Sequence, residues 1–226
     1  DDSATPAARP TYPRADKGAV QGLLARMYLN AEVYTGEPMW LEAKQACEAV
    51  FSMGYSLCPE YADLFRGDNG ENPDALKEII FGISYDAEQT QSYGGTSYLT
   101  LAAIAAADVS ATEMINGVNN GWGGIRVPYE YVEKYFDGRN PDYTTGTYDV
   151  RDKRGEMFYI KGRKESMDGA LYVFLNGWSC LKFNNIPHDE DNDSYIETSA
   201  IKAYSDIDYP MIRLGEIYLI YAEACM

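Results

Sequence analysis

The stretch DYPMIRLGEIYLIYAEACM, residues 208–226, is the most informative part of this chain for its fold class. Asp208 is a good helix N-cap and Pro210 suits a first turn, so the stretch predicts a helix that begins at Asp208. Its side chains are apolar around almost the whole circumference, so such a helix needs cover on most sides. We therefore expect the central helix of a larger protein, interrupted before its end.

The charged residues of this helix form one narrow stripe. Arg213, Glu216 and Glu223 fall on one side at about 100° per residue. We expect a structural role for them, in which Arg213 and Glu216 form an i,i+3 ion pair and help to hold neighbouring helices in register.

A second helical region lies near the N-terminus. Asp16 is an N-cap candidate, and apolar residues follow it at helical spacing as far as Tyr34. After the turn TGEP, a second helix is predicted from Met39 or Trp40 to about Met53. Its expected inward positions are Trp40, Ala43, Cys47, Val50 and Phe51.

Two helices joined by a short turn fit the spacing of a tetratricopeptide repeat loosely. One such repeat cannot stand alone, because stacked neighbours bury its apolar face. Residues 208–226 fit the front half of another hairpin of this kind. The predicted fold class is therefore mainly α, with a tetratricopeptide-like α-α superhelical scaffold, long loop-rich insertions and a few short β-strands.

The middle of the chain is irregular between these helical ends. Patterns within it predict a strand near Glu78–Tyr85, a helix at Tyr129–Phe136, and short strands at Glu156–Ile160 and Ala170–Leu175. We expect residues 1–15 to be a linker and 16–226 to be one domain. The domain comprises a helical hairpin (16–55), a loop-rich ligand-binding region (56–207) and a scaffold helix (208–226). Long loops on a helical frame are typical of recognition proteins.

Composition narrows the classes of partner. The formal net charge of −16 argues against nucleic acid or an anionic membrane surface. The sequence has no apolar run of the length that spans a bilayer. Tyrosine is unusually frequent, with 20 residues against 7 Phe and 3 Trp. Because tyrosine offers both a stacking face and a hydroxyl group, this excess suits binding surfaces, although a tyrosine-rich core is an equal alternative.

Patterns typical of enzymes are weak. The glycine-rich segments at 94–96 and 121–124 match neither phosphate-binding loop motif. The single histidine, His188, lies in an acidic loop and has no recognisable partners for a catalytic triad. None of the many carboxylate pairs is distinguished by an apolar surround. We expect no catalytic residues, and a glycoside hydrolase remains only the third alternative.

An acidic loop raises the question of a metal. Asp189, Asp191 and Asp193 occupy positions 1, 3 and 5 of an EF-hand count, but Ser194 and Ala200 stand at positions 6 and 12 and exclude a full EF-hand. A looser structural calcium site and a solvated acidic loop both remain open. The sequence suggests no other cofactor.

Aromatic residues beside amide groups are the remaining candidates for a site. A sugar ring has an apolar C–H face and a polar rim, so it suits an aromatic ring with hydrogen-bonding neighbours. Trp122 lies between glycines in a polar loop, where it could either stack on a ligand or anchor the loop. The candidate ligand-binding residues are Trp122, Tyr98, Tyr93, Asn119, Asn120 and Arg126.

Five segments in this order resemble the SusD/RagB family of outer-membrane nutrient-binding lipoproteins. They are the string from RADKGAVQG to SMGYSL (14–57), YADLFRGDN (61–69), EIIFGISYD (78–86), SYGGTSYL (92–99) and DYPMIRLGEIYLIYAEA (208–224). Family members are longer than this chain, so the resemblance implies that the lipid-bearing cysteine and further regions are missing here.

The resemblance implies a tetratricopeptide scaffold that carries ligand-binding loops. It also implies a surface-exposed lipoprotein of the bacterial outer membrane, held by an anchor outside this chain, that works with a SusC-like TonB-dependent transporter. Family ligands are oligosaccharides and sometimes peptides, and Tyr98 and Trp122 are the counterparts of aromatic glycan contacts. We therefore expect non-catalytic glycan binding. A tetratricopeptide-type protein-interaction scaffold and a peptide-binding, RagB-like receptor remain the alternatives.

Overall fold

The computed structural model describes residues 12–109, 115–169, 171–189, 194–195 and 202–226. It is a mixed structure with 39% helix and several small sheets. The chain divides into two compact units. The helical unit contains the residues up to Leu64 together with Asn69–Ser84 and Asp208–Met226, and the insertion unit contains Phe65–Asp68 and Tyr85–Ile207. The predicted linker at 1–15 lies almost wholly outside the described residues.

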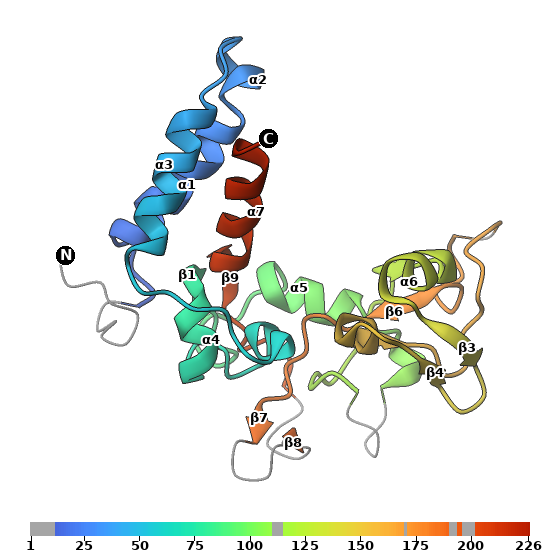
Figure 1. Ribbon diagram of the computed structural model, residues 1–226. Coiled ribbons are helices and arrows are strands. Elements are labelled where there is room, and N and C mark those ends of the chain that lie inside the picture. The colour runs from blue at the N-terminus through green and yellow to red at the C-terminus, as the bar shows by residue number, and fades with distance from the viewer. Residues whose placement is uncertain (1–11, 110–114, 170, 190–193, 196–201) are drawn as a thin grey trace. The chain divides into compact units, whose positions relative to one another are not determined.

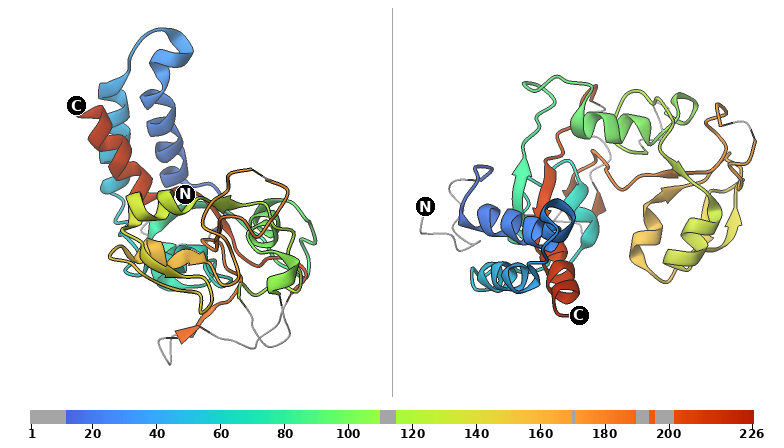
Figure 2. Two further views of the ribbon diagram at one scale, coloured as in Figure 1. Left: turned by 90° about the vertical axis from the view of Figure 1, so that its right-hand side faces the viewer. Right: turned by 90° about the horizontal axis from the view of Figure 1, so that it is seen from above.

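The helical unit consists of a layer of helices next to a two-stranded sheet (Figure 1). Helices α1, α3 and α7 lie side by side, as both views in Figure 2 also show. Strands β1 and β9 pair in antiparallel orientation. The elements of this unit are α1 (Lys17–Leu29), α2 (Ala31–Thr35), α3 (Trp40–Phe51), the 3-10 helix η2 (Tyr61–Phe65, shared with the other unit at Phe65), α4 (Pro73–Glu78), β1 (Ile79–Ile83), β9 (Tyr209–Arg213) and α7 (Leu214–Ala224).

Helix α1 begins where the sequence predicts. The Asp16 carboxylate accepts a hydrogen bond from the Ala19 amide at 3.0 Å, which satisfies one of the free N–H groups of the first turn. The predicted single helix to Tyr34 is wrong in one detail, because it breaks at Asn30 into α1 and α2. Gly36 then ends α2 in the left-handed conformation, with φ of 81°.

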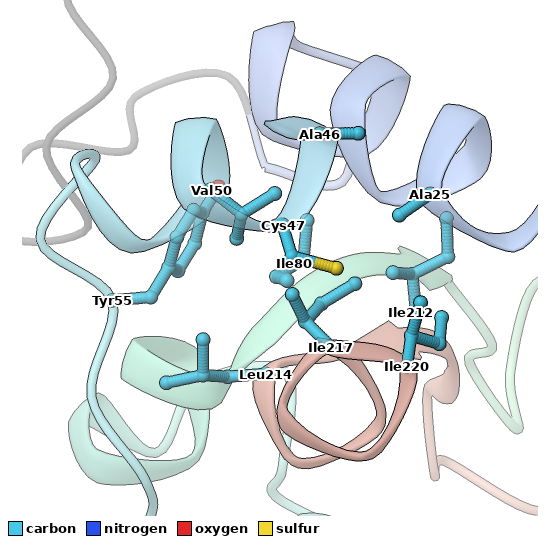
Figure 3. Close-up of a cluster of buried hydrophobic side chains, with 10 residues drawn as sticks. All are labelled: Ala25, Ala46, Cys47, Val50, Tyr55, Ile80, Ile212, Leu214, Ile217 and Ile220. Atoms are coloured by element: carbon cyan, nitrogen blue, oxygen red, sulfur yellow. The ribbon is translucent and has the colours of Figure 1, made fainter. Parts of the chain in front are cut away.

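One apolar core joins the three long helices and the sheet (Figure 3). Cys47 and Val50 of α3 are buried as predicted, and Ala25 of α1 lies in the same cluster. The prediction that Trp40 points inward is wrong, since its side chain is 40% exposed at the first residue of α3. The buried members of the core are Ala25, Ala46, Cys47, Val50, Tyr55, Ile80, Ile212, Leu214, Ile217 and Ile220.

The prediction of a helix from Asp208 is also wrong at its start. Residues 209–213 form strand β9, and α7 begins only at Leu214. The segment YPMIR alternates exposed and buried residues, with Pro210 and Ile212 inside, which is the period of a strand. The Asp208 carboxylate accepts hydrogen bonds from the hydroxyl groups of Tyr12 and Ser84, so it does not cap a helix.

The charged stripe has partners other than the predicted ones. Arg213 donates to the buried Glu78 carboxylate at 2.6 Å, and Glu216 accepts a bidentate hydrogen bond from Arg26 of α1. The predicted Arg213–Glu216 pair is therefore replaced by two pairs that link distant segments. The second pair joins α1 to α7, and bidentate geometry makes it the more specific kind of link.

The insertion unit holds the longer loops and three small sheets. Strand β6 lies between β2 and β5, while β3 pairs with β4 and β7 pairs with β8. The elements are α5 (Gly95–Ala102), η3 (Ala106–Asp108), β2 (Arg126–Val127), α6 (Tyr129–Phe136), β3 (Arg139–Asp142), β4 (Thr147–Asp149), η4 (Lys153–Met157), β5 (Phe158–Tyr159), β6 (Trp178–Cys180), β7 (His188–Asp189) and β8 (Ser194–Tyr195).

Predictions for the middle of the chain have mixed outcomes. The strand near 78–85 and the helix at Tyr129–Phe136 are confirmed as β1 and α6. The strand predicted at Glu156–Ile160 is shortened to β5, because a 3-10 turn occupies the residues before it. The strand predicted at 170–175 is wrong, since residues 171–175 form turns without strand pairing.

Trp178 is the centre of an apolar core in the insertion unit. Trp178 is fully buried among Val132 of α6, Phe158 of β5 and Ile160. Its indole N–H donates to the Tyr143 hydroxyl at 3.1 Å, as a buried indole requires. The fold is mixed, with 39% helix and small sheets, where the sequence predicts a mainly α class. Three packed helices are present, whereas a tetratricopeptide superhelix is not shown across the described residues.

Candidate ligand-binding site

Four aromatic side chains of the insertion unit form one cluster. The ring centroids of Tyr93 and Trp122 are 5.5 Å apart, and those of Tyr98 and Trp122 are 6.2 Å apart. Tyr204 joins the cluster at 4.9 Å from Tyr93. The planes are inclined at 41° to 60°, which is the edge-on or tilted range that aromatic pairs favour. Three of the residues predicted from sequence are therefore brought together.

The cluster is both anchored and open to solvent. Tyr93 is 60% exposed and Tyr98 is 50% exposed, which is high for large aromatic side chains. Trp122 is half-buried and packs against the small core of Leu101, Ile104 and Val118. Trp122 therefore anchors its loop and also contacts the exposed tyrosines, while stacking on a ligand stays a prediction.

Helix α5 presents Tyr98 outward through its pattern of burial. Thr96, Ser97, Thr100 and Leu101 are buried and share one face of the helix. Tyr98 lies roughly 130° from the middle of that face at 3.6 residues per turn. Some of the buried polar groups on this face have hydrogen-bond partners. For example, the Thr100 hydroxyl donates to the Thr96 carbonyl at 2.7 Å.

Main-chain hydrogen bonds hold the Trp122 loop against the end of α5. The amides of Trp122, Gly123 and Ile125 donate to the carbonyls of Leu101, Ile104 and Ala102 at 2.9, 2.8 and 3.0 Å. Gly121 permits this close approach, because a Cβ there would lie 2.5 Å from the Ile104 carbonyl oxygen. The sequence pattern of a tryptophan between glycines thus reflects a backbone-to-backbone contact.

A buried polar network holds the segment that carries Tyr204. The Asn185 side-chain oxygen accepts from the Asp206 amide at 2.7 Å and from the Ser205 hydroxyl at 3.2 Å. The Ser205 amide donates to the hydroxyl of Ser97 on α5 at 2.9 Å. Because Asn185, Ser205 and Ser97 are all buried, this network orders residues 202–206 relative to the helix that carries Tyr98.

The hydroxyl group of Tyr204 keeps its proton to higher pH than a free phenol does. A hydrogen bond with the Tyr93 side chain raises the pKa of Tyr204 above its usual 10.0. A higher pKa means that the phenol keeps its proton to more alkaline pH, so it remains both a donor and an acceptor. Such hydroxyl groups can bind sugar hydroxyls without contributing charge.

The neighbouring amides are accessible, whereas the arginine is already engaged. Asn119 and Asn120 are exposed, and the Asn120 side-chain oxygen accepts from the Gly121 amide at 2.8 Å. Arg126 donates from Nη1 to the carbonyls of Val173 and Asn176 and from Nη2 to that of Leu171. These bonds use three of its five N–H donors, and Nε is buried. Arg126 therefore orders a neighbouring loop, and its role as a ligand contact stays a prediction.

The acidic candidates for calcium lie largely outside the described residues. This applies to Asp191, Asp193 and the side chain of Asp189, whose backbone forms part of β7. Among the residues that the structure describes, no group of three or more His, Cys, Asp or Glu side chains could hold a metal ion. The calcium site stays a prediction.

Two residues of the candidate site, Tyr204 and Asn185, are not predicted from the sequence. Tyr204 stands in an irregular segment without periodicity, and Asn185 is one asparagine in a polar loop. Their importance comes from long-range contacts to residues 93 and 206, which no local pattern reports. The excess of tyrosine was the only available signal for Tyr204.

Comparison with known proteins identifies the family. The sequence profile of the SusD family matches residues 77–226. This chain belongs to the SusD family. It is 31% identical over 245 aligned positions to the starch-binding protein SusD of Bacteroides thetaiotaomicron, and 25% identical over 230 positions to a SusD-like protein of Bacteroides ovatus. Each alignment covers 94% of this chain.

Solved structures show the same fold. A SusD superfamily protein from Parabacteroides distasonis superposes with a TM-score of 0.58 at 20% identity, covering 95% of this chain and 40% of the other. A SusD-like protein from Bacteroides fragilis gives 0.59 at 18% identity, covering 96% and 44%. The chain also spans only 42% and 36% of the two sequence relatives.

The family is one of non-catalytic binding proteins, in agreement with the expectation from the sequence. Across the described residues, none of the helices combines the length and apolar character needed to cross a bilayer.

Proposed function

We propose that this member of the SusD family binds glycan through the cluster of Tyr93, Tyr98, Trp122 and Tyr204. The observation that supports this proposal is a group of exposed and half-buried aromatic rings, of which Trp122 packs on a small apolar core. A rigid aromatic surface loses little conformational entropy when a ligand binds. Soluble proteins rarely leave such a surface exposed without use.

Capture would combine stacking with hydrogen bonds. The C–H faces of pyranose rings pack on the aromatic rings, and each such contact contributes roughly 0.5–1.5 kcal/mol beyond burial. The exposed side chains of Asn119 and Asn120 offer amide donors to sugar hydroxyls beside Trp122. Because the individual contacts are weak, affinity is modest, which suits a protein that must release its ligand.

The first ligand class to test is starch-like α-glucan. The relative at 31% identity is named a starch-binding protein, and it aligns with nearly all of this chain. The excess of acidic residues disfavours polyanionic glycans as ligands.

The same family relationship supports a cellular setting for this activity. We propose a surface-exposed lipoprotein of the outer membrane that delivers captured glycan to a SusC-like TonB-dependent transporter. Attachment to the membrane would be through a lipid anchor outside this chain.

Affinity electrophoresis of the full-length protein through gels that contain starch, xylan, mannan or inulin tests the proposal. Retardation by at least one glycan, with starch the expected one, supports it. If no polysaccharide retards the protein and peptides from a casein digest bind instead, the glycan proposal fails and a peptide receptor replaces it.

A further inference from the structure

We propose that residues 171–176, the 171–176 loop, form a second stacking subsite that extends the aromatic cluster beyond Trp122. This inference rests on the proposed glycan-binding function and refines it. The ligand it implies is an oligosaccharide long enough to contact both Trp122 and the 171–176 loop. Four observations within the insertion unit support the subsite.

The first observation is a direct contact between the two surfaces. A Cβ added at Gly123 would lie 2.8 Å from Cβ, Cγ and Cδ2 of Phe174, so Phe174 packs on the backbone of the residue next to Trp122. Gly123 also has a φ of 66°, which favours glycine. Phe174 therefore lies directly beside the Trp122 loop, and the Arg126 guanidinium, 5.5 Å from the centroid of the Phe174 ring, helps to hold that ring in place.

The second observation is the exposure of the 171–176 loop. Tyr172 is 82% exposed, Phe174 is 45% exposed, and Leu171 and Leu175 are also open to solvent. Turn segments usually carry polar residues, so the sequence LYVFL in this position is costly unless a ligand covers it. A sugar ring can pack its C–H face on such side chains.

The third observation is that two guanidinium groups donate hydrogen bonds to the backbone of the 171–176 loop. Arg126 donates to the carbonyls of Leu171, Val173 and Asn176 at 2.7–2.8 Å. Arg163 donates to that of Phe174 at 2.9 Å. Four of the six carbonyl groups are thus bound by charged donors, which fixes the loop more firmly than its own turns could.

The fourth observation is that the second of these arginines is itself rigid. Arg163 is 1% exposed and forms an ion pair with Asp108 at 2.6 Å. Its guanidinium also lies 5.7 Å from the centroid of the Tyr159 ring. A buried ion pair is costly to maintain, so its use to hold an exposed apolar loop indicates that the conformation of the loop matters.

Together these features predict selection by ligand length. A short oligosaccharide fills only the Trp122 surface and gains nothing from the 171–176 loop. A longer one gains a second set of stacking contacts while it is already bound, so its affinity rises with little added entropic cost.

The test is calorimetric titration of the full-length protein with maltotriose and with maltoheptaose. If another polysaccharide binds better, the corresponding pair of oligosaccharides from that polysaccharide is used. The variants are Tyr172→Ala and Phe174→Ala, and the control is Tyr135→Ala, an exposed tyrosine on α6 outside both surfaces. We expect both loop variants to lose about fivefold or more in affinity for the long ligand and less than about twofold for the short one.

Other outcomes overturn the inference in distinguishable ways. If both ligands bind the loop variants as they bind the unaltered protein, the subsite does not exist, although the proposed function stands; a protein contact would then explain the exposed loop. Equal losses for short and long ligands would also contradict it, because they indicate a general disturbance of the site. If the unaltered protein binds no glycan, the proposed function and the inference fail together.

Discussion

The ring centroids of Tyr93 and Trp122 lie 5.5 Å apart, with their planes inclined at 60°. Tyr93 belongs to the segment before α5, while Trp122 belongs to the loop that returns along the end of α5. The helix between them thus brings two exposed or half-exposed rings to one surface.

Substitution of Gly121 by alanine should displace the Trp122 loop. The new methyl group would meet the Ile104 carbonyl oxygen at 2.5 Å, and main-chain atoms cannot yield as a flexible side chain can. We expect at least about a tenfold loss of glycan affinity, measured by calorimetry. Gly162→Ala is the control, since alanine would be strained at this φ of 71° but would meet no neighbouring atom within 4 Å. It should lower stability by about 1 kcal/mol and leave binding unchanged.

Removal of the Asn185 side chain should destabilise the segment that carries Tyr204. The Asp206 amide and the Ser205 hydroxyl would lose their acceptor in a buried setting, which costs about 1–3 kcal/mol for each unsatisfied group. Denaturant unfolding of Asn185→Ala should show this loss. Asn119→Ala, at an exposed position, should weaken glycan binding without lowering stability. An unchanged midpoint for Asn185→Ala would contradict the structural role of the network.

Local patterns predicted much of the helical unit. Asp16 caps α1 because a side-chain acceptor is followed at once by helix-forming residues, and this relationship lies within one turn. The residues of α6 are likewise predicted to both ends. The error at Asp208 has a different origin. Its carboxylate is bound by Tyr12 and Ser84, and the pairing of β9 with β1 overrides the local preference for a helix.

In the candidate site, too, local patterns predict some residues and long-range contacts determine others. Trp122, Tyr93 and Tyr98 could be selected because aromatic residues among glycines and amides are unusual in a loop. The polar sequence neighbours of Arg126 predict a ligand contact, but they do not predict its three hydrogen bonds to carbonyls of the 171–176 loop. Tyr204 was missed for the converse reason, since only long-range packing places it beside Tyr93.

Loss of the buried ion pair between Asp108 and Arg163 should lower the stability of the protein strongly. Asp108→Ala leaves the guanidinium group of Arg163 buried without its counter-ion, and such losses cost about 3–5 kcal/mol. Desolvation lowers the pKa of Arg163, yet an arginine still does not lose its proton near neutrality. Lys77→Gln removes a pair exposed on α4 and should cost at most about 1 kcal/mol. Chemical denaturation would measure the free energy of unfolding of both variants. Equal losses of stability would contradict the larger contribution of the buried pair.

Binding of a neutral glycan should depend little on salt or pH. The proposed contacts are aromatic rings, hydroxyl groups and amides, so no counter-ions are released on binding. The hydrogen bond that Tyr204 shares with Tyr93 raises the pKa of Tyr204 above 10.0, and deprotonation of Tyr204 therefore begins only at more alkaline pH. Affinity should vary less than about twofold between about pH 6 and pH 9. A steep fall with added salt would show that charged groups carry the binding.

The most direct test of the account is the affinity of the Trp122→Ala variant for starch-derived maltoheptaose, measured by calorimetry beside Tyr135→Ala. Trp122 is in contact with both Tyr93 and Tyr98, so its removal takes away the centre of the stacking surface. We predict a loss of at least about tenfold, or about 1.4 kcal/mol, for Trp122→Ala and no change for Tyr135→Ala. Undiminished binding by a folded Trp122→Ala variant would contradict the central claim that this aromatic cluster captures the glycan.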